Sequence, residues 1–145
     1  MKKLIFTTFT LLAIPACSLV KSTPFDPKTC TEQIPKHIEG LEILGGSRTE
    51  QSIINDMQIT FCNGQVLLQK MNERGNDVSP GTAVLKVVVE YTGEVVSSEI
   101  IETDILSTEF VAKVSDFVKD TDFSSWQRFD EDTEFIYPMV FYRWW

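Results

Sequence analysis

From residue 47 onward, apolar residues recur at two periods, and the changes between these periods predict the secondary structure. Steps of three or four put apolar side chains on one face of a helix, whereas alternate positions put them on one face of a strand. The helical period covers 47–72 and 107–118, and the alternating period covers 82–91, 95–102 and 133–143. We therefore expect the order helix, strand, strand, helix, strand.

Both predicted helices begin at a side chain that can cap them. Ser47-Arg48-Thr49-Glu50 fits a capping box, in which the serine oxygen and the glutamate each accept a hydrogen bond from a free backbone N–H. Ser107 can cap the second helix. Gly64 lies on the first apolar stripe and costs about 1 kcal/mol relative to alanine, which indicates close packing against a neighbouring element. The stripes are Ile53, Met57, Phe61, Gly64, Leu68 and Met71, then Phe110, Val111, Val114, Phe117 and Val118.

The alternating segments predict a hairpin and a separate final strand. Thr92-Gly93 supplies the tight turn of the hairpin. Pro138 cannot donate a hydrogen bond to a neighbouring strand, which predicts that the final strand lies at an edge or at a bulge. The predicted fold class is α+β, with a small antiparallel three-stranded sheet packed by two helices. The first and the last of the three alternating segments each have one apolar face. These faces consist of Ala83, Leu85, Val87, Val89 and Tyr91, and of Phe135, Tyr137, Met139 and Phe141.

The first 17 residues have the layout of a secretory signal. A basic head is followed by an apolar stretch over 4–14, and the small Ala16 precedes Cys17. The stretch is too short to span a bilayer as a permanent helix. Ile14-Pro15-Ala16-Cys17 resembles a bacterial lipobox. That resemblance implies cleavage after residue 16 and acylation of Cys17, with palmitate among the acyl chains.

Lipidation predicts where the protein is located. Each buried methylene of an acyl chain adds roughly 0.8 kcal/mol of membrane affinity, so several chains anchor a protein firmly. Ser18 stands where a lipoprotein retained in the inner membrane often carries Asp. This favours the periplasmic face of the outer membrane of a Gram-negative bacterium. The alternative is an ordinary signal peptide whose cleavage falls near a cysteine.

The mature chain is expected to be strongly acidic. Removal of residues 1–16 takes away two lysines and no acidic residue, so the formal charge of −8 becomes −10. Nucleic acids and anionic lipid headgroups are bound by clustered Lys and Arg, so the charge argues against both as partners. Roughly 130 residues remain, which is enough for one domain with a sizeable core.

With Cys17 assigned to the anchor, Cys30 and Cys62 remain in an oxidising compartment, and the simplest interpretation is a structural disulfide. Such a bond would stabilise the fold by about 3–4 kcal/mol by restricting the unfolded chain. The alternative, a redox role, usually appears as Cys-x-x-Cys, which the sequence lacks. His37 is the only histidine and no cysteine pair has ligand spacing, so neither a metal site nor a cofactor is predicted.

Few motifs point to catalysis. The sequence has no Gly-x-Ser-x-Gly elbow, no phosphate-binding glycine loop and no helical pair of metal-binding histidines. To act as a general base, His37 would need a nucleophile or an orienting carboxylate beside it. Asp130-Glu131-Asp132 with Glu134 could bind a cation, but the spacing is not that of a calcium loop, and a solvated loop is the simpler interpretation.

Short motifs spread over about 48–141 carry a family resemblance. They are Arg48-Thr49-Glu50 with Ile53, Asn63-Gly64-Gln65 with Leu67, Gly81 before a Val-rich strand, Gly93-Glu94-Val95, Leu106 with Phe110, Asp122-Phe123, and Tyr137-Pro138-Met139-Val140-Phe141. In order and spacing these resemble the TonB C-terminal domain superfamily, and more closely its AgmX/PglI C-terminal-like variant. The resemblance implies an exposed sheet edge to which an extended peptide can add as a further strand.

The chain also departs from that family. Members that transduce energy have an uncleaved N-terminal membrane helix and a long Pro-rich linker, and this sequence has neither. A lipoprotein at the outer membrane with the tether over 17–46 is not expected to reach an inner-membrane motor. The resemblance therefore implies the fold without energy transduction, because a fold alone does not define a function.

The final strand and the two residues at the C-terminus form the predicted partner-binding edge. Two terminal tryptophans are costly to leave in water, so they pack on the domain, touch the membrane interface or contact a partner. The candidate residues are Tyr137, Met139, Phe141, Trp144 and Trp145.

The sequence predicts a signal peptide over 1–16, a lipidated N-terminus with a tether and an irregular or short-strand segment over 17–46, and the TonB-like domain over 47–145. The predicted function is that of a non-catalytic, lipid-anchored envelope protein that faces the periplasm as a protein-interaction or accessory module. No small-molecule substrate and no nucleic acid is expected. The alternatives are a purely structural lipoprotein without a specific ligand, and a periplasmic redox protein or enzyme.

Overall fold

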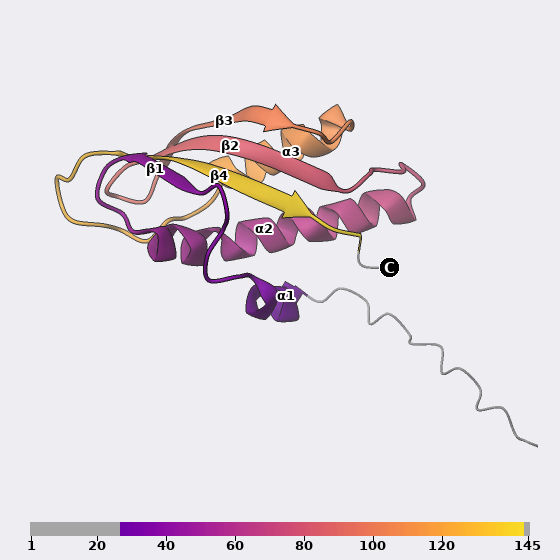
Figure 1. Cartoon of the computed structure of the whole chain (residues 1–145), viewed down its shortest axis with the longest axis horizontal. Helices are drawn as coiled ribbons and strands as arrows, with labels where there is room; N and C mark the ends of the chain where they lie inside the picture. The colour runs from indigo at the N-terminus through magenta and orange to yellow at the C-terminus, as the bar shows by residue number, and fades with distance from the viewer. Residues whose placement is uncertain (1–26, 144–145) are drawn as a thin grey trace, which may run out of the picture.

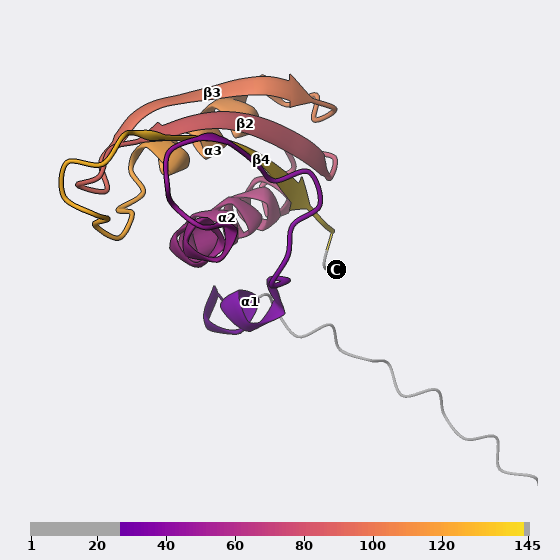
Figure 2. The same cartoon turned by 60° about the vertical axis from the view of Figure 1, so that its left-hand side comes forward.

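A four-stranded sheet and three helices make up residues 27–143, the part of the chain that the computed structural model describes. The elements are α1 (Pro27–Gln33), β1 (Glu42–Gly45), α2 (Glu50–Glu73), β2 (Gly81–Val89), β3 (Val95–Thr103), α3 (Thr108–Lys119) and β4 (Thr133–Phe141). Figure 1 shows the long helix α2 running beneath the sheet, and Figure 2 shows the sheet curving over α2, with α1 on the other side of that helix. The α+β class and the order of the last five elements agree with the sequence prediction.

The sheet has one strand more than predicted. Its order is β1-β4-β2-β3, and every neighbouring pair is antiparallel. The additional strand is β1, which lies in the segment predicted to be irregular or to form a short strand. Local pattern does not place this strand in the sheet, because β1 has only four residues, Glu42–Gly45, and none of them is fully buried.

In the strand order β4 lies between β1 and β2, so the prediction that it forms an edge is wrong for Glu134–Ile136, but it holds for the rest of β4, including Pro138, which among the described strands pairs with β2 alone. Pro138 is accommodated there because β1 is short. β2 pairs with β4 from Thr133 to Phe141, whereas β1 pairs with β4 only over Glu134–Ile136. At Pro138 the strand therefore has β2 on one side and is past the end of β1 on the other. The missing N–H interrupts no hydrogen bond to β1.

The core lies between the sheet and the helices α2 and α3. Gly64 is a point of close approach between α2 and β4, since a Cβ atom there would lie 2.7 Å from Cε1 of Phe141. The Phe141 ring also stacks on Phe61 at 5.8 Å and meets Phe110 edge-on at 5.1 Å. The close packing predicted from Gly64 is confirmed. The helices and the two central strands supply Ile53, Ile54, Met57, Leu68, Met71, Phe110, Val114, Val118, Ala83, Leu85, Val87, Val89, Phe135, Tyr137, Met139 and Phe141.

The N-cap of α2 lies two residues later than predicted. Thr49 is the N-cap, and its hydroxyl accepts the backbone N–H of the residue three positions on at 3.2 Å. Ser47, predicted as the cap, instead donates to the carboxylate of Asp130 and accepts the indole N–H of Trp126 at 2.9 Å. The second cap is confirmed, because the Ser107 hydroxyl accepts the backbone N–H of Phe110 in the first turn of α3 at 3.3 Å.

The helix α1 is joined covalently to α2. Cys30 and Cys62 form a disulfide with an S–S distance of 2.01 Å and a Cα–Cα distance of 5.9 Å. Both cysteines are buried, so part of the segment predicted as a tether is packed on the domain. Within residues 27–143, no helix combines the length and the apolar character needed to cross a membrane.

Candidate binding surfaces

Three of the residues predicted for a binding edge lie in the core. Tyr137, Met139 and Phe141 are at most 1% exposed and belong to the apolar cluster beneath the sheet. The backbone of β4 is covered by β1 only over Glu134–Ile136, and beyond that point β4 pairs with β2 alone within residues 27–143. Trp144 and Trp145 lie outside the described residues, as does the predicted lipidation site, Cys17.

The strand β3 forms one edge of the sheet, because it pairs with β2 alone within the described part of the chain. The register between the two strands shifts twice, and these shifts leave Val96 and Ile101 as extra residues on β3. Both side chains are exposed, at 55% and 46%. The two bulges therefore enclose a regular stretch, Ser97–Ile100, whose outer side carries no strand within residues 27–143.

The bulges have a signal in the sequence. Alternation alone predicts an uninterrupted strand over 95–102 and so misses them. The doublets Val95-Val96 and Ile100-Ile101 each place two apolar residues side by side, which interrupts the alternation where the register shifts.

The side chains around the β3 edge are acidic. Glu99 and Glu102 are exposed on β3, and Glu94 is exposed just before it. Lys86 lies opposite Glu99 on β2, but its Nζ atom is already 2.6 Å from Oε1 of Glu134 on β4. The hydrogen bond and the charge of Glu134 raise the pKa of Lys86. The β3 edge is therefore acidic, and Lys86, the cation opposite Glu99, already pairs with Glu134 on β4.

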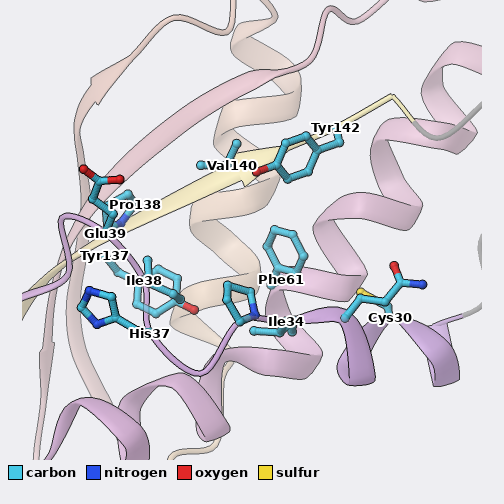
Figure 3. A pocket seen from close by; sticks show the side chains of 12 residues that line it. Cys30, Ile34, His37, Ile38, Glu39, Phe61, Tyr137, Pro138, Val140 and Tyr142 are labelled. Atoms are coloured by element: carbon cyan, nitrogen blue, oxygen red, sulfur yellow. The ribbon is translucent and has the colours of Figure 1, made fainter.

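A second surface is a groove between the segment 34–41, which follows α1, and the C-terminal half of β4. We call it the α1–β4 groove, and its cavity volume is about 420 Å³. Figure 3 shows Phe61 of α2 within it, with Val140 and Tyr142 at the end of β4 on one side and Ile34 on the other. The remaining lining residues are Cys30, Gln33, Pro35, His37, Ile38, Glu39, Tyr137 and Pro138.

Local contacts hold the outer wall of this groove in place. Nδ1 of His37 lies 2.5 Å from Oε1 of Glu50 at the start of α2. Gly40 has a positive φ of 84°, and a Cβ atom there would lie 3.1 Å from Cγ of Pro138. Burial raises the pKa of the Tyr137 phenol on the inner side. The groove was not predicted, because its walls come from parts of the chain far apart in sequence.

Arg48 connects the start of α2 to the turn between β2 and β3. Its side chain is 1% exposed. Nη1 donates to the carbonyl of Ser124 at 2.7 Å, and Nη2 donates to the carbonyl of Glu90 at 3.0 Å. Burial lowers the pKa of Arg48, and the Asp56 carboxylate at 3.8 Å opposes that shift. These contacts fix the position of the hairpin that carries β3.

The residues weighed as ligands or catalysts do not gather at one site, although the Glu50 carboxylate lies 2.5 Å from Nδ1 of His37. No three His, Cys, Asp or Glu side chains gather as metal ligands within residues 27–143. In the acidic run, Asp130 accepts from Ser47 and Glu134 pairs with Lys86. Comparison of the chain with models of protein families, with curated proteins and with solved structures gives no match. The two surfaces described above therefore carry the functional argument.

Proposed function

We propose that this protein is a non-catalytic, lipid-anchored module of the bacterial envelope that binds an extended segment of a partner protein along β3. The proposal includes lipidation at Cys17, the periplasmic face of the outer membrane and a TonB C-terminal-like domain. It replaces β4 with β3 as the binding strand. The observation that carries it is the outer side of β3, which no other strand covers within residues 27–143.

Strand addition fits the geometry of this edge. Main-chain hydrogen bonds to an edge strand supply affinity, while side chains on either side supply selectivity. The regular stretch Ser97–Ile100 offers a short ladder, and the bulges at its ends limit the length of segment that can pair. Val96 and Ile101 provide exposed apolar contacts at the two ends of that ladder.

The charge of the edge favours a basic partner segment. Glu99 and Glu102 face solvent, so Lys or Arg in the added strand would pair with them. Exposed ion pairs contribute about 0.2–1 kcal/mol each, so charge would act on selectivity and association rate more than on affinity. Binding is therefore expected to weaken as salt increases.

The same features also favour the second candidate, a structural lipoprotein without a specific ligand. Bulges and charged side chains are devices that keep a sheet edge from pairing with other chains. Under this alternative Val96 and Ile101 remain in water, and the edge binds nothing.

Site-specific crosslinking in cells separates the two candidates. A photoreactive phenylalanine analogue replaces Val96 on the β3 edge or, as a matched control, Ile59, which is 67% exposed on α2. Peptide binding at β3 predicts one discrete adduct from position 96 and none from position 59. The double change Glu99→Lys with Glu102→Lys should reduce that adduct, whereas the charge-matched pair Glu32→Lys with Glu39→Lys should not. No adduct at 96, or one that is insensitive to the β3 charges, favours the structural candidate.

The anchor is tested separately. Metabolic labelling with palmitate should mark the protein, and Cys17→Ser should abolish the label. A label that persists in the Cys17→Ser protein contradicts lipidation at this residue, whatever the crosslinking shows.

A further inference from the structure

The α1–β4 groove presents apolar side chains that no element covers within residues 27–143. Ile38, Phe61 and Val140 are partly exposed along it, and Tyr142 is 55% exposed at its end. Apolar surfaces of this kind usually contact another group. The dipeptide Trp144-Trp145, which begins two positions after Tyr142, is the nearest apolar chain in sequence outside the described residues.

The structure fixes the direction in which the chain leaves β4. Gln65 is fully buried on α2, where its amide donates to the carbonyl of Tyr142 and accepts the N–H of the same residue at 3.2 Å. Nη2 of Arg143 lies 3.6 Å from Oδ1 of Asp77, and neither residue lines the groove. Side chains alternate along an extended chain, so if the chain continued in this way Trp144 would lie on the Tyr142 side and Trp145 on the Arg143 side.

The volume and the chemistry of the groove suit one indole ring. Its volume of about 420 Å³ lies within the roughly 300–1,000 Å³ typical of small-molecule pockets, so it is large enough to receive an indole ring. Most of the lining is apolar, while Gln33 and the phenol of Tyr137 offer polar atoms. A buried indole N–H usually finds such a partner.

We propose that the α1–β4 groove is the docking site for the side chain of Trp144. Docking would cover the half of β4 beyond β1 and fasten the C-terminus to the segment after α1. The proposal is independent of peptide binding at β3, because the groove lies at the opposite side of the sheet order. It also predicts that an external partner does not use the groove.

Nuclear magnetic resonance tests the docking directly on the mature chain carrying Cys17→Ser, which needs no detergent. The two terminal indole signals are assigned with Trp144→Phe and Trp145→Phe. We expect the ring lost in Trp144→Phe to show short-range contacts to the methyl groups of Ile38 and Val140. The proposal is overturned if that ring shows no such contact, or if the Trp145 ring makes the contacts instead.

Dye binding provides a second readout on the same chain. An anilinonaphthalene dye gains fluorescence on exposed apolar surface. We expect its signal to rise several-fold in Trp144→Ala and to stay unchanged in the matched variant Trp145→Ala. Equal signals from the unaltered Cys17→Ser chain and Trp144→Ala would show that the groove is open and would overturn the proposal. A groove that excludes dye only in the lipidated protein would identify an acyl chain as the occupant, which also overturns it.

Discussion

Replacing Arg48 with methionine measures how much the β2–β3 end of the domain depends on one buried cation. Methionine keeps the long unbranched stem of arginine and removes the guanidinium group. The change deprives the carbonyls of Ser124 and Glu90 of donors at 2.7 and 3.0 Å. It also removes the cation 3.8 Å from the carboxylate of Asp56, whose side chain is only 11% exposed.

The size of the loss follows from these contacts. Hydrogen bonds to a charged donor contribute about 1.5–3 kcal/mol each. The guanidinium also lies 5.7 Å from the ring of Phe123 and 5.5 Å from that of Trp126, and such cation–π contacts contribute about 0.5–1 kcal/mol. Desolvation, which lowers the pKa of Arg48, opposes these gains. Removing one partner of a buried charged network costs about 3–5 kcal/mol, so we expect Arg48→Met to lower the free energy of unfolding by about 3 kcal/mol.

Urea denaturation followed by circular dichroism, with the disulfide intact, checks this value. Small proteins unfold with slopes of about 1–3 kcal/mol per molar urea, so the midpoint should fall by about 1–3 M at an unchanged slope. Arg48→Lys keeps the charge without the planar fork and should lose about 1–2 kcal/mol. The control is Arg128→Met, because Arg128 is exposed 4.8 Å from the ring of Phe129; it should change stability by less than about 0.5 kcal/mol. A loss below about 1 kcal/mol for Arg48→Met, or equal losses at both arginines, would refute the reasoning.

Three further predictions concern the core and the cross-link. Gly64→Ala adds a methyl group against Phe141 and should destabilise the fold by about 1–2 kcal/mol in urea, since overpacking outweighs the gain in helix propensity; a stabilised variant contradicts this. Burial raises the pKa of Tyr137, so the unfolded chain releases this proton above pH about 10 while the folded chain retains it. Stability is fully present below that pH and falls as pH rises, and Tyr137→Phe should flatten this alkaline loss; an identical pH profile would show that another group causes it. Changing both Cys30 and Cys62 to alanine should lower the free energy of unfolding by about 3–4 kcal/mol and speed hydrogen exchange in α1, and unchanged exchange would mean that α1 packs without the bond.

The elements from residue 50 onward could be predicted because the spacing of their apolar residues marks the face that packs into the core. Ile53, Met57, Leu68 and Met71 repeat at the helical period, and all of them are buried. The strand β2, the helix α3 and the strand β4 likewise bury the side that their sequence periods mark as apolar, whereas β3 has no fully buried residue. Local pattern succeeds here because each element is long enough to carry two or more repeats of its period.

The remaining features depend on partners that are distant in sequence. The strand β1 is placed by its pairing with β4, and α1 by a bond from Cys30 to Cys62, so neither has a strong local signal. Pro138 correctly marks a position past the end of one ladder, but a local rule cannot tell that β1 lies beside the first half of the same strand. The α1–β4 groove is lost for the same reason, because no single stretch of sequence contains it. The β3 edge was not predicted for another reason. The doublets Val95-Val96 and Ile100-Ile101 are visible in the sequence, but a prediction based on alternation treats 95–102 as one regular strand.

The disulfide also determines where mechanical tension would enter the domain. If Cys17 carries the proposed anchor, a pull between membrane and protein travels along the chain to Cys30. There the covalent path divides, and the short branch crosses the sulfur atoms to Cys62, which is buried within α2. The long branch through β1 carries little load, so a force on the anchor cannot peel β1 from β4 one residue at a time. The load instead reaches the long helix packed beneath the sheet, which resists as a unit.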